Sequence, residues 1–205
     1  MARNGASLEL VHETARLICE DAILDYRLAK QKAAQRLGLS AKAALPDNAR
    51  IHAAVLEYQR LFGGREYAEH LQRLRAVAVQ SLRLLAEFQP RLVGAALSGA
   101  STQAHRVQLH AFAERAEAVE VFLENRGIAC EQGERRYRYP DGREEDIALV
   151  GFEAGEIGVD VAVFAPGDER RAPLSPTEGS LMKRAALAEA EALARLSPEE
   201  VLAAP

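Results

Sequence analysis

Apolar residues recur at helical spacing through the first 88 residues of the chain. Behind Ser7, a typical N-cap, the first stripe consists of Leu8, Val11, Ala15, Ile18 and Ala22. Similar stripes predict helices over residues 26–38, 47–62 and 65–88, bounded by residues that commonly cap or end helices. Amphipathic helices of this kind are stable when they pack on one another, so we expect an N-terminal helical bundle.

The pattern changes after Pro90. Alternating apolar and polar residues predict strands at 91–98 and 106–112 and, after an amphipathic helix over 114–127, three more at about 135–139, 146–153 and 157–164. In the strand at 135–139 we expect Tyr137 and Tyr139 to cover the core while Arg135, Arg136 and Arg138 face water.

A loop, a helix near residues 180–195 and a weak turn at 197–202 complete the predicted elements. We therefore divide the chain into a helical region (1–89), an α/β domain (90–170) and a C-terminal loop and helix (171–205). The expected fold class is α+β, with a mixed β-sheet and flanking helices.

Composition and charge narrow the function. With 48% hydrophobic and 27% charged residues, the chain is typical of a folded globular protein. Its net charge of −4 and its lack of tryptophan argue against a nucleic-acid partner, although a basic stripe (Arg27, Lys30, Lys32, Arg36) is the best candidate for one. Cys19 and Cys130 form no disulfide or zinc pattern, and no stretch indicates a signal peptide or membrane span, so we expect a cytoplasmic protein.

Residues 90–165 hold small residues after a first strand (Leu97 to Ser101), a second strand, a helix, and a later strand with a single carboxylate, Asp160. This order resembles the nucleotidyltransferase superfamily. The resemblance implies a Gly-Ser pair that cradles nucleotide phosphates, a D-x-D on the second strand that holds Mg²⁺, and a third Asp that completes the site.

The chain departs from this pattern at the metal-binding positions. Arg106 and Gln108 stand where the two aspartates are expected, and Ala100 stands in place of the phosphate-binding Ser. A guanidinium repels a cation, so we expect a degenerate site with no catalytic residue, no metal and no cofactor. An active divergent transferase, the first alternative, would need Mg²⁺ held by Glu153, Glu156 or Asp160.

The vacated cleft is the candidate binding site for a nucleotide or another anionic small molecule. Its candidate ligand-binding residues are Ser98, Gly99, Ser101, Thr102, Arg106, Gln108, His110 and Asp160. A solvated outer face is the competing interpretation for the polar residues of the second strand, and an internal ion pair with Arg is the competing one for Asp160.

Two further alternatives concern the helices. Arg65 and His70 form an R-x4-H that resembles the motif of HEPN-type ribonucleases, in which Arg stabilises phosphate and His transfers protons. The helices are also consistent with a plain interaction module that binds a protein partner or a second copy of the chain in a regulatory role.

Overall fold

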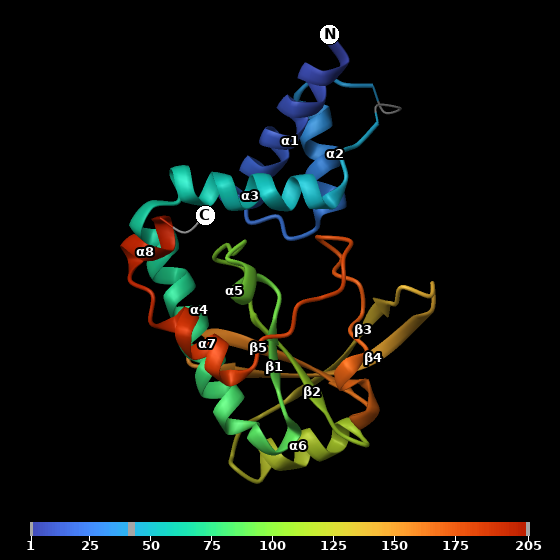
Figure 1. Ribbon diagram of the computed structural model, residues 1–205, viewed down its shortest axis with the longest axis vertical. Coiled ribbons are helices and arrows are strands. Elements are labelled where there is room, and N and C mark those ends of the chain that lie inside the picture. The colour runs from blue at the N-terminus through green and yellow to red at the C-terminus, as the bar shows by residue number, and fades with distance from the viewer. Residues whose placement is uncertain (1, 41–43, 204–205) are drawn as a thin grey trace.

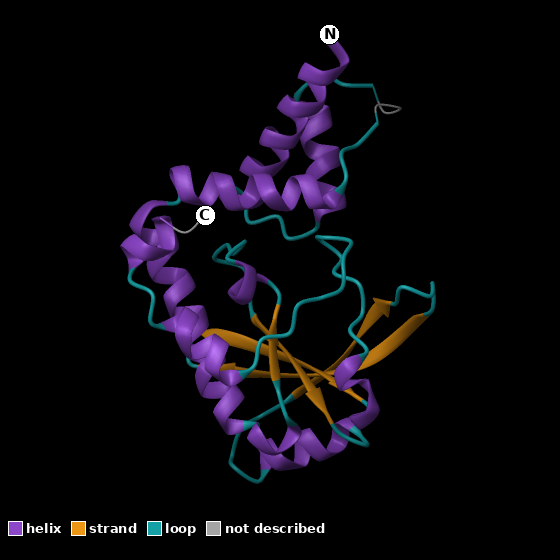
Figure 2. Ribbon diagram, in the orientation of Figure 1, coloured by secondary structure: helices purple, strands orange, loops and turns teal. Residues whose placement is uncertain are grey.

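Four α-helices precede the sheet in the computed structural model, which describes residues 2–40 and 44–203 (Figures 1 and 2). They are α1 (Ala2–Glu20), α2 (Tyr26–Arg36), α3 (Asn48–Phe62) and α4 (Gly64–Leu84). The side chains of Asp25 and Asp47 cap α2 and α3 by accepting hydrogen bonds from backbone N–H groups of the first turn. Residues 41–43, in the predicted loop before α3, lie outside the described residues.

Two helix boundaries differ from the prediction. Ser7 lies inside α1 and does not cap it, because the residues before Ser7 are helical as well. The fourth helix ends at Leu84, and a single 3₁₀ turn (Ala86–Phe88) follows it. Gln89 then adopts a φ of 48° before Pro90, whose ring disfavours a helical conformation in the residue that precedes it.

Different helices contribute to different hydrophobic clusters. α1, α2 and α3 enclose one of them, which contains Leu10, Ile18 and Val55. α4 instead packs on the sheet, where its residues Leu74 and Leu82 belong to the core shared with the strands. The helical region therefore consists of a three-helix bundle and a fourth helix that joins this bundle to the sheet.

Five strands form one mixed sheet in the described part of the chain. They are β1 (Arg91–Val93), β2 (Val107–Phe112), β3 (Glu131–Arg138), β4 (Glu144–Ala154) and β5 (Ile157–Phe164). The spatial order is β1-β2-β5-β4-β3, with β2 parallel to β5 and all other neighbours antiparallel. The α+β class with flanking helices is thus confirmed, and β1, β2 and β5 are neighbours.

The first strand is shorter than predicted. β1 ends at Val93, and Ala95–Ser98 form a short helix, α5, instead of extending the strand. Gly94 makes the turn between them with a φ of 70°, a conformation that residues with a Cβ rarely adopt. The small residues Leu97 to Ser101 consequently lie one helical turn beyond the strand end, and Gly94-Ala95 occupy the position directly after it.

The two faces of the sheet have different surroundings. Val107, Leu109 and Ala111 of β2 pack in the core that also contains residues of α4 and of α6 (Ala116–Glu124). Gln108 and His110 project to the opposite face because side chains alternate along a strand. The register places Gln108 directly beside Asp160 of β5 on that opposite face.

The C-terminal segment is integrated into both parts of the fold. After a 3₁₀ turn (Pro166–Arg170), Ala185 pairs with Leu92 beside β1, and α7 (Leu187–Ala194) and α8 (Pro198–Ala203) pack against α4 (Figure 1). The predicted helix near 180–195 starts only at Leu187, because the residues before it are extended along β1. The predicted turn at 197–202 is helix α8. None of the described helices is both long enough and apolar enough to cross a membrane.

Candidate functional site

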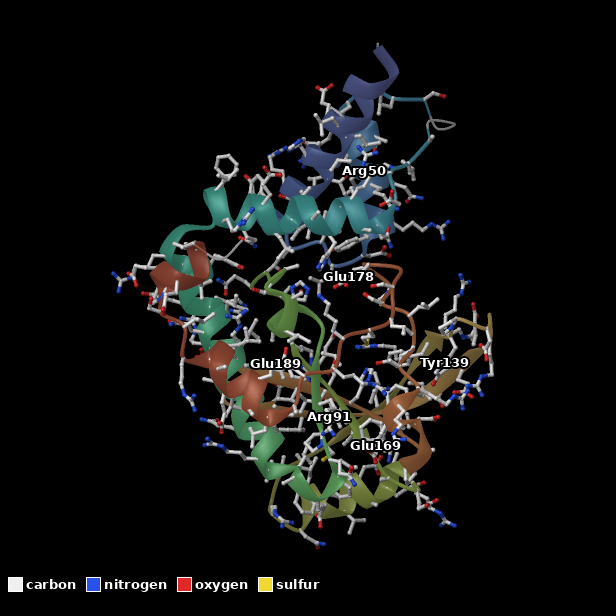
Figure 3. All side chains as sticks on the ribbon, viewed as in Figure 1. Arg50, Arg91, Tyr139, Glu169, Glu178 and Glu189 are labelled. Atoms are coloured by element: carbon white, nitrogen blue, oxygen red, sulfur yellow. The ribbon has the colours of Figure 1, made fainter. Side chains whose placement is uncertain are left out.

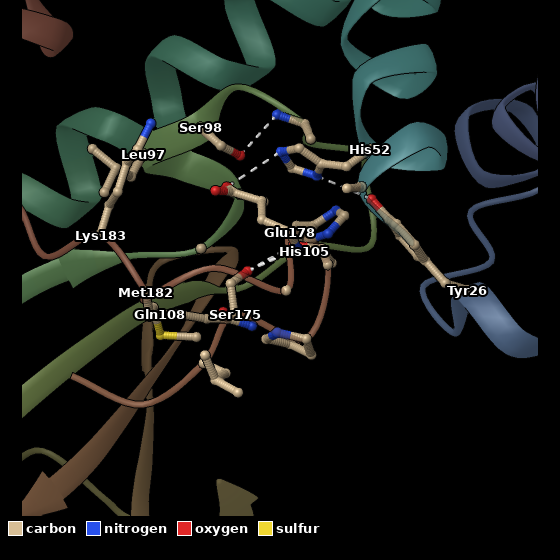
Figure 4. A pocket seen from close by; sticks show the side chains of 18 of the residues that line it. Tyr26, His52, Leu97, Ser98, His105, Gln108, Ser175, Glu178, Met182 and Lys183 are labelled. Carbon is tan, nitrogen blue, oxygen red and sulfur yellow. Dashed lines mark hydrogen bonds and ion pairs between the residues drawn. The ribbon is translucent and has the colours of Figure 1, made fainter. Parts of the chain in front are cut away.

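A cleft of about 1040 Å³ lies between the three-helix bundle and the open face of the sheet. Tyr26, His52 and Leu56 line its helical side, and Gly94, Ser98 and Gln108 are among the residues that line the side formed by the sheet and α5. Residues 174–179, 182 and 183 of the C-terminal segment line it as well (Figure 4). Glu178, which belongs to this segment, lies between α3 and the sheet (Figure 3).

Cationic side chains outnumber carboxylates around the cleft. The lining includes Arg135, Arg136, Arg138 and Lys183, against Glu178 and Glu189. Arg136 and Arg138 form exposed ion pairs with Asp146 and Glu144 of the neighbouring strand. Lys183 is exposed and makes no ion pair with any described residue. Because Arg135, Arg136 and Arg138 are each paired with a carboxylate, Lys183 is the cation of this lining that is best placed to bind an anionic group.

An ion-pair network occupies the position at which the resemblance places the metal. Arg106 Nε lies 2.7 Å from Asp160 Oδ1, and Arg135 Nη2 lies 3.2 Å from Asp160 Oδ2. Arg106 also reaches Glu153, with its Nη1 2.7 Å from Oε1. Both oxygens of Asp160 therefore bind guanidinium groups. No group of three or more His, Cys, Asp or Glu in the described chain is arranged to hold a metal ion, so these residues do not fit Mg²⁺.

Gly158 provides the space that Arg106 needs. A Cβ on Gly158 would overlap the guanidinium of Arg106, and a Cβ on Gly151 would lie 3.7 Å from Nη2 of Arg106. The guanidinium thus lies flat across β5 and β4 at two positions without side chains. Arg106 and Gly158 thus fit each other sterically across the sheet, and the ion-pair network of Arg106 depends on this fit.

Gln108 lies on the cleft floor, next to the turn after β1. A Cβ on Gly94 would overlap the Gln108 side-chain oxygen, so this turn requires glycine for its close approach as well as for its φ. Gln108 and Gly94 are thus in close contact at this end of the cleft.

The predicted hydroxyl loop is held mainly by the helices. Tyr67 Oη donates to the Gly99 carbonyl (2.7 Å), Gln59 Nε2 to the Ser101 carbonyl (2.6 Å), and His70 Nε2 to the Thr102 carbonyl (3.0 Å). Ser101 and Thr102 are buried, whereas Ser98 lines the cleft. The loop is therefore a well-anchored wall, and Ser98 is the member of the predicted hydroxyl set that faces the cleft.

His110 is separated from the other candidates on β2. It is fully buried, packs against Tyr137 and Phe164, and accepts a hydrogen bond from Arg184 Nε through Nδ1 (2.9 Å). Burial and the charges of Arg184 and Arg135 hold the pKa of His110 well below its usual range. His110 therefore anchors the C-terminal segment and does not line the cleft.

Two histidines in the cleft wall are held largely neutral. Burial lowers the pKa of His105 to about 4; its Nδ1 accepts a hydrogen bond from the N–H of Thr102 and lies 3.0 Å from the Thr102 hydroxyl. His52 contacts Tyr26 Oη through Nδ1 (3.3 Å) and Glu178 Oε1 through Nε2 (3.6 Å). Burial lowers the pKa of His52, and Glu178 partly offsets this effect.

Some residues of the two enzymatic alternatives meet in a second, smaller pocket of about 280 Å³, which His70, Glu153 and Glu156 help to line. Arg65 is exposed and pairs with Glu69, while His70 is buried against the 99–102 loop. Glu153 is paired with Arg106, and Glu156 lies on the turn between β4 and β5, outside the lining of the cleft. Arg65 is not among the residues that line the smaller pocket, so the structure does not bring Arg65 and His70 together there.

Sequence reasoning missed Arg135, Lys183, His52 and Tyr26. Arg135 was expected to face water, but it shares a strand face with Tyr137 and Tyr139, as period-two alternation requires, and it reaches Asp160. The other three come from segments distant in sequence, and no local pattern marks them. Comparison of the chain with family models, curated proteins and solved structures gave no match, so its function has to be argued from this geometry.

Proposed function

We propose that the chain is a non-catalytic, nucleotidyltransferase-like protein whose cleft binds a nucleotide or another anionic small molecule without a metal ion. The observation that carries the proposal is the pairing of Asp160 with both Arg106 and Arg135, of which Arg135 lines the cleft. The adjacency of β1, β2 and β5 supports the resemblance on which the proposal also depends.

The chemistry of the cleft is suited to a ligand with both an anionic and an apolar part. Lys183 offers a charge-assisted hydrogen bond to a phosphate or carboxylate oxygen. Leu24, Tyr26 and Leu56 on the helical side offer an apolar surface for a ring. No nucleophile in the described lining is paired with an activating base, which is why binding and regulation are favoured over catalysis.

The experiment measures thermal unfolding with ATP, GTP, CTP and UTP, each with Mg²⁺ and with EDTA. A ligand at about 100 times its Kd stabilises the folded state by about 2.7 kcal/mol. We expect stabilisation that survives EDTA. Stabilisation that disappears in EDTA would contradict the metal-free site and favour the divergent transferase, and no shift with any nucleotide would favour a protein partner instead.

A variant pair locates the binding. Lys183→Gln should weaken the binding of the stabilising nucleotide about tenfold, because it removes one charge-assisted contact to phosphate. Lys32→Gln, an exposed lysine of α2 outside the cleft lining, is the matched control and should leave the affinity unchanged. Equal affinities of the two variants would place the nucleotide outside this cleft.

A further inference from the structure

Residues 174–181 form a small, self-contained projection, which we call the flap. Leu174 and Leu181 pair as an antiparallel bridge at its base. Within it, Ser175 N donates to the Ser180 carbonyl (2.7 Å), Gly179 N donates to the Ser175 carbonyl (2.9 Å), and Ser175 Oγ accepts from Glu178 N (3.1 Å). Gly179 has a φ of 69°, which lets the tip turn back tightly. The flap therefore keeps its shape through its own hydrogen bonds.

The base of the flap is fixed to the sheet. Leu174 N donates to the Arg138 carbonyl at the end of β3 (2.7 Å), and Met182 N donates to the Pro173 carbonyl (2.8 Å). Immediately beyond it, Arg184 donates to buried His110 and to the Asp168 carbonyl. These contacts join the base to the rigid half of the molecule, so any movement of the flap is expected at its tip.

The tip crosses the cleft to α3 and is held there weakly. Asn48 Nδ2 donates to the Pro176 carbonyl (2.7 Å), and Glu178 Oε1 lies 3.6 Å from His52 Nε2 (Figure 4). These are the polar contacts recorded between the flap and α3 among the described residues. The hydrogen bond is exposed, and the second contact is longer than a hydrogen bond and involves a histidine that burial keeps largely neutral.

We propose that the flap opens and closes the cleft as a unit, hinged on the sheet and latched to α3 by Asn48 and His52. Leu174 to Gly179 line the cleft, and Lys183 lies two residues beyond the flap, so movement of the tip changes both the access to the cleft and its volume. A ligand that contacts both the helical side and the flap joins them, and its binding favours the closed state. This inference rests on the proposed function only for the identity of that ligand.

A single tryptophan can report the position of the flap because the chain contains none. Thr177→Trp places it on the flap and, separately, Ala53→Trp places it on the opposite wall of the cleft. Acrylamide quenching and the emission maximum are measured for each reporter alone, with Asn48→Ala, and with Asn125→Ala, an exposed asparagine of the α6 C-terminus that serves as the matched control. Thermal unfolding of every variant verifies that it is folded.

We expect Asn48→Ala to raise the open population about threefold to tenfold, the change in equilibrium produced by removing a hydrogen bond of ordinary strength. Quenching should increase and emission should shift to the red with both reporters, whereas Asn125→Ala should change neither. ATP in EDTA should reverse the change. Equal quenching in Asn48→Ala and Asn125→Ala with both reporters overturns the proposal.

The outcomes separate this inference from the proposed function. Opening by Asn48→Ala without any response to nucleotides would support the flap and contradict the nucleotide site. Nucleotide stabilisation in EDTA, combined with unchanged quenching in all variants, would support the site and contradict the flap.

Discussion

Replacing Gly158 by alanine tests whether the ion-pair network of Arg106 depends on the space that Gly158 leaves in the sheet. A Cβ at this position overlaps the guanidinium of Arg106, so the side chain of Arg106 has to leave β5. Its departure removes the 2.7 Å contacts to Asp160 and Glu153. Arg135 then remains as the guanidinium beside Asp160.

The cost follows from the exposure of the two carboxylates. Glu153 is 60% exposed, so its ion pair contributes about 0.5 kcal/mol or less. Asp160 is 19% exposed and accepts a charge-assisted hydrogen bond from Arg106, which contributes about 1.5–2 kcal/mol. Because the arginine is flexible, it can swing away without distorting the backbone. We therefore expect Gly158→Ala to lower the free energy of unfolding by about 2 kcal/mol, or the melting temperature by about 4–8 °C.

The assay is a double-mutant cycle by urea unfolding. In the Arg106→Ala background the obstructing guanidinium is absent, so Gly158→Ala should cost less than about 0.5 kcal/mol. Gly167→Ala is the matched control, since nothing lies within 4 Å of its Cβ position, and should be near neutral. Equal costs of Gly158→Ala with and without Arg106 would refute the fit between the two residues.

Three further predictions concern stability. The pKa of His105 is about 4 in the folded chain and 6.5 in the unfolded chain, so its neutral form contributes its full stabilisation above pH 6.5. About 2–3 kcal/mol of the free energy of unfolding is therefore lost as the pH falls toward 4. Urea unfolding across this pH range should show a smaller loss in His105→Asn. Asp47→Ala removes the α3 cap and should cost about 1 kcal/mol, measured by thermal unfolding, and an unchanged melting temperature would contradict the assignment of the cap. Tyr67→Phe leaves the Gly99 carbonyl without its buried donor and should cost about 1–2 kcal/mol, while a neutral effect would show that the helices do not hold this loop.

Local patterns were sufficient for the elements whose formation depends on nearby residues. The cap at the start of α3, the helical stripes and the alternation along β2 all act within a few residues, so they can be read from the chain directly. The prediction was wrong where a distant partner decides the conformation. Residues 181–186 are extended because Ala185 pairs with Leu92, and Leu97 lies in a short helix because Gly94 turns the chain beside Gln108.

In the candidate site, too, some features follow from the local sequence and others from contacts between distant segments. The sequence by itself determined that Arg106 and Gln108 lie at the start of the second strand and that a later strand carries Asp160. Only the tertiary structure decided that Asp160 lies between two guanidinium groups, that Gly158 makes room for one of them, and that Lys183 and His52 line the same cleft. The physical reason is that side-chain identity is local, whereas ion pairing and enclosure depend on distances between segments that meet only when strands and helices pack.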